Sequence, residues 1–163
     1  MSDHPTGFFR PFEEAAMDVA LAQARAAGDA GEIPIGAVVL DEEGVIIGSA
    51  GNARRESHDP TAHAEVLAIR EAAQERRDWR LDGCSLVVTL EPCPMCAGAA
   101  VMARLDRVVF GAWNEEYGAG GSRWDLMRDR RLTHRIEVLS GLRAQECGML
   151  VREFLAERRE DGT

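Results

Sequence analysis

Two short segments near the middle of the chain constrain its fold most strongly. SLVVTL (85–90) and RVVFGA (107–112) are almost entirely apolar. Runs of this kind are typical of strands in a sheet that is covered on both faces. Between them, Pro94–Ala103 has a helix-like composition and opens with proline, which suits the first turn of a helix. The sequence therefore predicts a buried strand–helix–strand unit.

The rest of the chain continues the alternation of strands and helices. The expected elements are helices over Phe12–Ala27, Thr61–Arg77 and Ala144–Arg159, a short helix near Trp124–Asp129, and strands over 33–40, 45–52 and 136–141. In the last helix, Leu150, Phe154 and Leu155 are expected to face inward. This alternation indicates an α/β sandwich, and 163 residues is the usual length of one domain, residues 1–163.

Charge and composition narrow the function classes. The formal net charge of −9 taken alone argues against a nucleic-acid partner, although every basic residue is arginine, which suits bidentate phosphate contacts. No apolar run approaches the roughly 20 residues that span a membrane. The N-terminal residues lack the pattern of a signal peptide, so we expect a cytoplasmic protein. In that compartment its four cysteines are expected to be thiols or metal ligands.

The segments DPTAHAE and LEPCPMCAG carry the candidate chemistry. Each is expected where the chain runs into the N-terminus of a helix, whose partial positive charge favours a metal-binding thiolate. His63, Cys93 and Cys96 supply three ligands for zinc. A catalytic zinc site has three protein ligands and an open position for water, whereas a structural site has four.

Glu65 is the candidate base of this site. Two thiolates neutralise the formal charge of the metal, so a separate base helps to activate water. In an ideal helix, side chains two positions apart point about 200° away from each other. Glu65 and His63 can therefore share a site only if the helix is just starting there.

Other interpretations of these residues stay open. The Cys-x-x-Cys segment alone is also typical of a redox motif. A fourth zinc ligand would make the site structural, and the candidates for it are Cys84, Cys147, His58 and His134.

The combination of His-x-Glu with Pro-Cys-x-x-Cys resembles the signature of zinc deaminases. The resemblance extends to EIPIGAVVL, HDPTAHAEVLAIR, TLEPCPMCAGA, RVVFGA and ECGMLVREF, and covers roughly Phe12–Arg159. Together these segments are similar to the bacterial tRNA-specific adenosine deaminases. That family converts the wobble adenosine of an arginine tRNA anticodon to inosine. It implies a cytidine-deaminase-like, three-layer α/β/α sandwich with a mixed five-stranded sheet, and a homodimer with active sites near the subunit interface.

The resemblance also implies roles for particular residues. His63, Cys93 and Cys96 would hold one Zn²⁺ per subunit, and Glu65 would shuttle protons during hydrolytic deamination. Asn52 would contact the target nucleotide, and the partner would be the tRNA anticodon arm. Arg158 and Arg159 match a basic pair that approaches RNA; these two residues also suit a solvated helix end.

One segment departs from the family pattern. After RVVFGA the family usually has an Asp followed two residues later by Lys or Arg, whereas in this chain Glu116 replaces the basic residue, with Glu115 beside it. Like charge there would repel the RNA backbone. Trp113 and Tyr117 could offset this by stacking on bases. A set of nearby arginines could contact phosphates: Arg123, Arg128, Arg130, Arg131 and Arg135.

Two alternative functions remain. Deaminases of free nucleobases or nucleosides, of the guanine or cytosine type, share both motifs, and the acidic balance favours them. A non-catalytic, zinc-stabilised scaffold subunit belongs to another class. Glu65 argues against a scaffold, because a structural zinc site does not need this carboxylate.

Overall fold

In the computed structural model, which describes residues 8–162, the strands form one five-stranded sheet in the order β2-β1-β3-β4-β5. The strands are β1 (Gly36–Leu40), β2 (Ile46–Gly51), β3 (Ser85–Leu90), β4 (Arg107–Ala112) and β5 (Glu137–Ser140). The helices are α1 (Pro11–Asp29), α2 (Ala64–Arg76), α3 (Pro94–Met102) and α4 (Ala144–Glu160). No helix in this described part of the chain has the length and apolar character needed to cross a membrane.

The sheet is mixed. Strand β1 is antiparallel to its two neighbours, β2 and β3, whereas β3, β4 and β5 run parallel. The parallel pair β3 and β4 is joined through α3, because parallel neighbours require a crossover connection. The predicted strand–helix–strand unit and mixed sheet are therefore confirmed.

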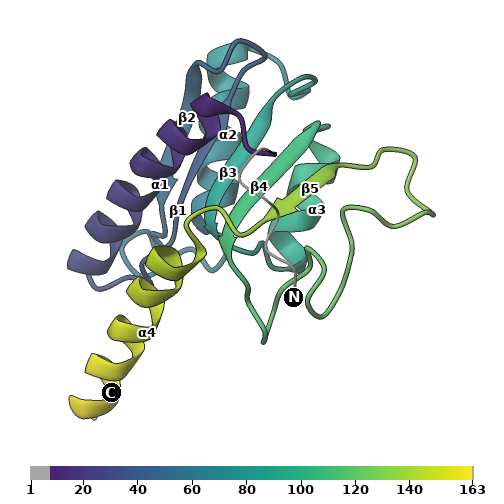
Figure 1. Cartoon of the computed structure of the whole chain (residues 1–163). Helices are drawn as coiled ribbons and strands as arrows, with labels where there is room; N and C mark the ends of the chain where they lie inside the picture. Colours follow the sequence, from purple (N-terminus) through teal and green to yellow (C-terminus); the bar gives the residue numbers. More distant parts are fainter. Residues whose placement is uncertain (1–7, 163) are drawn as a thin grey trace.

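Helices cover both faces of the sheet, with α1 and α4 on one side and α2 and α3 on the other (Figure 1). Successive residues of β1 show this division. Ala37 and Val39 belong to the core beneath α2 and α3, and Val38 and Leu40 belong to the core beneath α1 and α4. The predicted three-layer α/β/α sandwich is confirmed.

Glycines in the strands let two helices lie close to the sheet. A Cβ atom on Gly36 would lie 1.8 Å from the carbonyl oxygen of Ala20 in α1. A Cβ on Gly48 would lie 2.3 Å from the carbonyl oxygen of Ala68 in α2. Any side chain at these positions would push the helix away, so Gly36 fixes the distance between α1 and the sheet, and Gly48 fixes that between α2 and the sheet.

The prediction of a short helix near Trp124–Asp129 is wrong. This segment forms one turn of its own, from the N–H of Asp129 to the carbonyl of Leu126, and other backbone bonds join it to the loop before it. The N–H of Gly121 donates to the carbonyl of Trp124, the N–H of Leu126 donates to that of Ala119, and Gly120 forms an isolated bridge with Asp125. Its backbone groups are therefore used in pairing across a turn.

The prediction that Leu155 faces inward is also wrong, because its side chain is 42% exposed. Leu150 and Phe154 are half-buried. The reason is geometric: α4 starts against the sheet and then extends beyond it (Figure 1), so its second half has no strand beneath it.

Candidate active site

The start of α2 positions His63 and Glu65. Asp59 Oδ1 accepts hydrogen bonds from the N–H and the hydroxyl of Thr61, which makes a turn before the helix. The helix therefore starts at Ala64, not near Thr61 as predicted. His63 is the N-cap and has extended backbone angles (φ −75°, ψ 149°). Because His63 is outside the helix, the 200° separation of an ideal helix does not apply to it and Glu65.

The start of α3 positions the two cysteines in the same way. Cys93 is the N-cap, Pro94 opens the helix, and Cys96 lies in its first turn. Both predicted motifs thus lie at helix N-termini, where the partial positive charge of the helix stabilises thiolates.

The two helix starts bring three ligand atoms together. His63 Nδ1 lies 3.6 Å from Cys93 Sγ and 3.5 Å from Cys96 Sγ. A tetrahedral zinc ion with a Zn–S distance of about 2.3 Å and a Zn–N distance of about 2.0 Å would separate these atoms by about 3.5 Å. The spacing therefore fits zinc without rearrangement of the chain.

In the described residues this trio is the one group with metal-ligand spacing, and no fourth protein ligand joins it. The other candidates are engaged elsewhere or exposed. Cys84 contacts Arg76, Cys147 lies against Met17, His134 bonds to the carbonyl of Leu105, and His58 is exposed. A site with three ligands leaves the position for water that a catalytic zinc ion needs.

Glu65 has the environment of a proton-transfer group. Its side chain is 4% exposed, and burial raises its pKa to about 7. Glu65 Oε2 is buried and has no hydrogen-bond partner in the described structure. A buried carboxylate oxygen without a partner, two residues after the ligand His63, is chemically able to accept a proton and to return it.

The pKa values of the two thiols at the site are shifted in opposite directions. Hydrogen bonds with Cys96 and His63 lower the pKa of Cys93 to about 4, which favours the thiolate form of Cys93. The neighbouring Cys93 raises the pKa of Cys96, and the pKa of His63 is raised by its hydrogen bond with Cys93. A thiolate is the form of cysteine that binds metal.

Asn52 joins the end of β2 to the start of α2. It is 5% exposed, and its Oδ1 accepts a hydrogen bond of 3.1 Å from the N–H of Ala64. The resemblance to the deaminase family predicts that Asn52 contacts the target nucleotide. The structure adds that the same side chain holds the helix that carries Glu65.

A cavity of about 1160 Å³ opens beside the ligand atoms. Asn52, His63 and Cys93 lie in its wall. The loop after β4 and the exposed side of α4 complete it. The loop contributes Trp113, Asn114, Glu115, Glu116 and Tyr117, and α4 contributes Gly148, Val151, Arg152 and Leu155. Trp113 packs edge-on against Phe110 of β4, with 5.0 Å between the ring centroids, so its position is fixed from the core.

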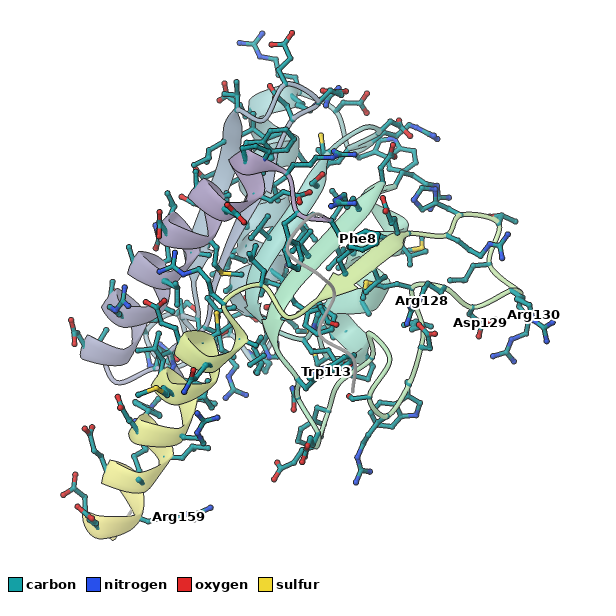
Figure 2. The ribbon with its side chains drawn as sticks, in the orientation of Figure 1. Phe8, Trp113, Arg128, Asp129, Arg130 and Arg159 are labelled. Atoms are coloured by element: carbon teal, nitrogen blue, oxygen red, sulfur yellow. The ribbon has the colours of Figure 1, made fainter. Side chains whose placement is uncertain are left out.

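The proposed phosphate-contacting arginines are mostly paired within the chain. Arg128 pairs with Asp125, and Arg131 pairs with Asp129, on a loop that projects away from the body of the molecule (Figure 2). Arg158 donates to the carbonyl of Gly31. Arg159 is exposed at the far end of α4 (Figure 2).

Two arginines that the sequence did not single out line the cavity instead. Arg54 and Arg152 are exposed, and neither forms an ion pair with an acidic group in residues 8–162. Arg54 follows Asn52 closely in the chain, which could have indicated it. Arg152 reaches the cavity only through the course of α4.

The comparison with known proteins agrees with this geometry. The zinc-binding region of the cytidine and deoxycytidylate deaminases matches residues 11–112. Over 148 residues the chain is 44% identical to the tRNA-specific adenosine deaminase of Bacillus subtilis, and the match covers 91% of each protein. The chain belongs to the tRNA-specific adenosine deaminases of this family.

Two solved structures are similar to this deaminase chain over most of its length. One comes from a study of A-to-I editing by tRNA:A34 deaminases at the wobble position of transfer RNA. It has a TM-score of 0.80 and 41% identity, and covers 83% of this chain and 98% of its own. The other is a guanine deaminase from Nitrosomonas europaea, with a TM-score of 0.76 and 27% identity, covering 96% of this chain and 98% of its own.

Proposed function

We propose that the chain is one cytoplasmic domain that deaminates, by hydrolysis, the wobble adenosine in the anticodon of an arginine tRNA to give inosine. The observation that carries this proposal is the position of His63 and Cys93 in the wall of a cavity of about 1160 Å³. Cys96, which completes the ligand trio, and Glu65 are buried. Sites for small molecules usually measure about 300–1,000 Å³. A larger, open cavity suits a base together with its flanking nucleotides.

His63, Cys93 and Cys96 would hold one Zn²⁺, since the spacing of their ligand atoms fits a tetrahedral ion. When bound, zinc lowers the pKa of a water molecule and so makes it a nucleophile near neutral pH. The protein's part is to hold two thiolates and one imidazole in place and to leave one position open.

Glu65 would carry the protons of the reaction. It accepts a proton from water as the C–O bond forms at C6 of adenine. It gives this proton to the ring nitrogen N1. It then takes the proton of the new C6 hydroxyl and passes it to the amino group, which leaves as ammonia when the C6–N6 bond breaks and the C6 carbonyl forms. A pKa of about 7 suits both directions of transfer. A scaffold subunit would have no use for a buried carboxylate with an unpartnered oxygen.

The substrate must present its base outside a stack. Turning a base out of an anticodon loop costs less than opening a duplex. Arg54 and Arg152 at the cavity are the cations available for the flanking phosphates, and Trp113 and Tyr117 offer aromatic surfaces. These groups would offset the repulsion from Glu115 and Glu116.

An anticodon stem-loop series tests this function. Purified zinc-loaded protein would be given the arginine tRNA stem-loop, and stem-loops of other tRNAs with adenosine at the wobble position. Inosine formation is read by mass spectrometry. We expect inosine at the wobble position of the arginine stem-loop and none at other adenosines. A stem-loop that stays unmodified under all conditions would contradict the proposal.

Asn52 is proposed to donate its side-chain amide to the target nucleotide while its oxygen holds α2. Asn52→Asp keeps an oxygen for the N–H of Ala64 and removes the donor. We expect the KM for the stem-loop to rise about tenfold, with little change in melting temperature. Asn52→Ala, which removes both groups, should also lower the melting temperature. A wild-type KM for Asn52→Asp would exclude the contact.

A second candidate function is the deamination of a free base such as guanine. The similarity to a guanine deaminase at a TM-score of 0.76, and the acidic pair Glu115 and Glu116 in the cavity wall, favour it. Release of ammonia from guanine by the wild-type protein would support this candidate.

We also propose a homodimer, formed through the outer face of α3. This helix has no charged residue, and Met102 is 66% exposed. Burial of such a face against a second copy removes apolar surface from water. We expect Met102→Glu to weaken the dimer about a hundredfold, measured by analytical ultracentrifugation. Met149→Glu, an exposed methionine of α4, is the matched control and should stay dimeric. An unchanged mass for Met102→Glu would exclude this interface.

A further inference from the structure

A buried carboxylate lies between the zinc-ligand segment and the loop that walls the cavity. Glu91 follows β3 directly and is 1% exposed. Its Oε1 accepts a hydrogen bond of 3.0 Å from the N–H of Asn114. Its Oε2 accepts bonds from the N–H of Gly120 (2.9 Å), from the N–H of Ser122 (3.1 Å) and from the hydroxyl of Ser122 (2.9 Å). All four donors belong to the loop after β4.

The same loop is fitted closely around this carboxylate. A Cβ atom on Gly118 would lie 2.2 Å from Glu91 Oε1, so no side chain has room there. The N–H of Ala119 donates a hydrogen bond of 2.8 Å to the carbonyl of Pro92. The segment that leads into Cys93 is therefore bonded to the loop at successive residues.

The loop held in this way faces the substrate cavity. Trp113 (Figure 2) and the residues 114–117 line it, and the hydrogen bond to Asn114 lies at the start of that stretch. The N–H of Tyr117 in turn donates to Asn114 Oδ1, so the position of Tyr117 depends on that of Asn114. The carboxylate thus determines where the aromatic and acidic groups of the wall stand.

We propose that Glu91 is a positioning residue for substrate: it holds the wall formed by 113–117 at a set distance from the zinc ligands. Glu91 itself is not among the residues that line the cavity. This inference rests on the proposed function for the identity of the substrate, a nucleotide within an RNA loop. A group that acts only through the wall should affect binding of the substrate more than the chemical step.

Glu91→Gln is the sharpest test, because it preserves the shape of the side chain and replaces one acceptor oxygen by an NH₂ donor. The amide oxygen is expected to stay with the three donors at Oε2, which leaves NH₂ facing the N–H of Asn114. We expect about tenfold faster hydrogen exchange of amides 114–117, a KM for the stem-loop raised about tenfold, a kcat within about threefold, and unchanged zinc content.

Glu13→Gln is the matched control. Glu13 is a fully buried carboxylate, and it pairs with Arg107 in a part of the chain that does not line the cavity. It should lower the melting temperature and leave KM and the exchange of 114–117 unchanged. If Glu91→Gln does not fold, Ser122→Ala removes one donor to Oε2 and should raise KM in the same direction.

The outcomes separate the two proposals. A Glu91→Gln protein with faster exchange and raised KM supports the positioning role. Wild-type exchange and wild-type KM, or a fall in melting temperature alone as in Glu13→Gln, would overturn it. If the wild-type protein leaves the stem-loop unmodified and deaminates guanine, the proposed function fails. The exchange measurement and the KM for guanine then test Glu91 on their own.

Discussion

Replacing Glu65 with Gln is expected to lower kcat for deamination by about 10²–10⁴-fold, the usual contribution of general acid–base catalysis. Gln has the shape of Glu but cannot accept and return a proton at the orphaned Oε2 position. None of the three zinc ligands changes, so zinc content should stay at one per chain. Single-turnover inosine formation and metal analysis on the same sample measure both quantities.

The matched control for this prediction is Glu71→Gln. Glu71 lies on the same helix, α2, but its side chain is exposed. It should retain wild-type kcat. A Glu65→Gln protein with a kcat within about tenfold of wild type would contradict the role of Glu65 as proton carrier.

Replacing Cys93 with Ala is expected to remove zinc and abolish activity. Only two ligands would remain, and a bound metal also stabilises the fold in which it binds. At a free zinc concentration about 1,000 times the dissociation constant this linkage amounts to about 4 kcal/mol. The melting temperature of the zinc-loaded protein should therefore fall towards that of wild-type protein treated with chelator.

Cys84→Ser provides the control for the loss of a buried cysteine. Cys84 is buried. It contacts Arg76 and the carbonyl of Asp82 and none of the three zinc-ligand residues. The Cys84→Ser protein should keep one zinc per chain and its deaminase activity. Full zinc content in Cys93→Ala, or loss of zinc in Cys84→Ser, would contradict the assignment of the ligands.

The parts of the fold that were predictable from sequence are those with a local pattern. The apolar runs 85–90 and 107–112 are buried strands in the structure because both faces of the central sheet are covered. The local pattern predicts a helix start at each motif, whereas the resemblance to the zinc deaminases is what indicates that His63 and Cys93 share one site. The segment 124–129 was not predictable, since its hydrogen-bond partners lie across a turn and carry no helix or strand period.

The cavity was less predictable than the metal ligands. Its wall is assembled from the loop after β4, from α4 and from the residues that follow β2, which are far apart in the chain. Arg152 and Leu155 gain their place only from the direction of α4. Glu91 stands close to Cys93 in sequence, yet its role depends on four donors that come from a loop beyond the next strand.

The central claim is that one site deaminates adenosine within an RNA loop, and a competition in one tube tests it most directly. Zinc-loaded protein would receive the arginine tRNA stem-loop together with free adenosine, adenine, guanine and cytosine, and all products would be read by mass spectrometry. We expect inosine in the stem-loop and no change in the free compounds. Turnover of a free base with an untouched stem-loop would contradict the claim, and would make Glu115 and Glu116 the first residues to replace.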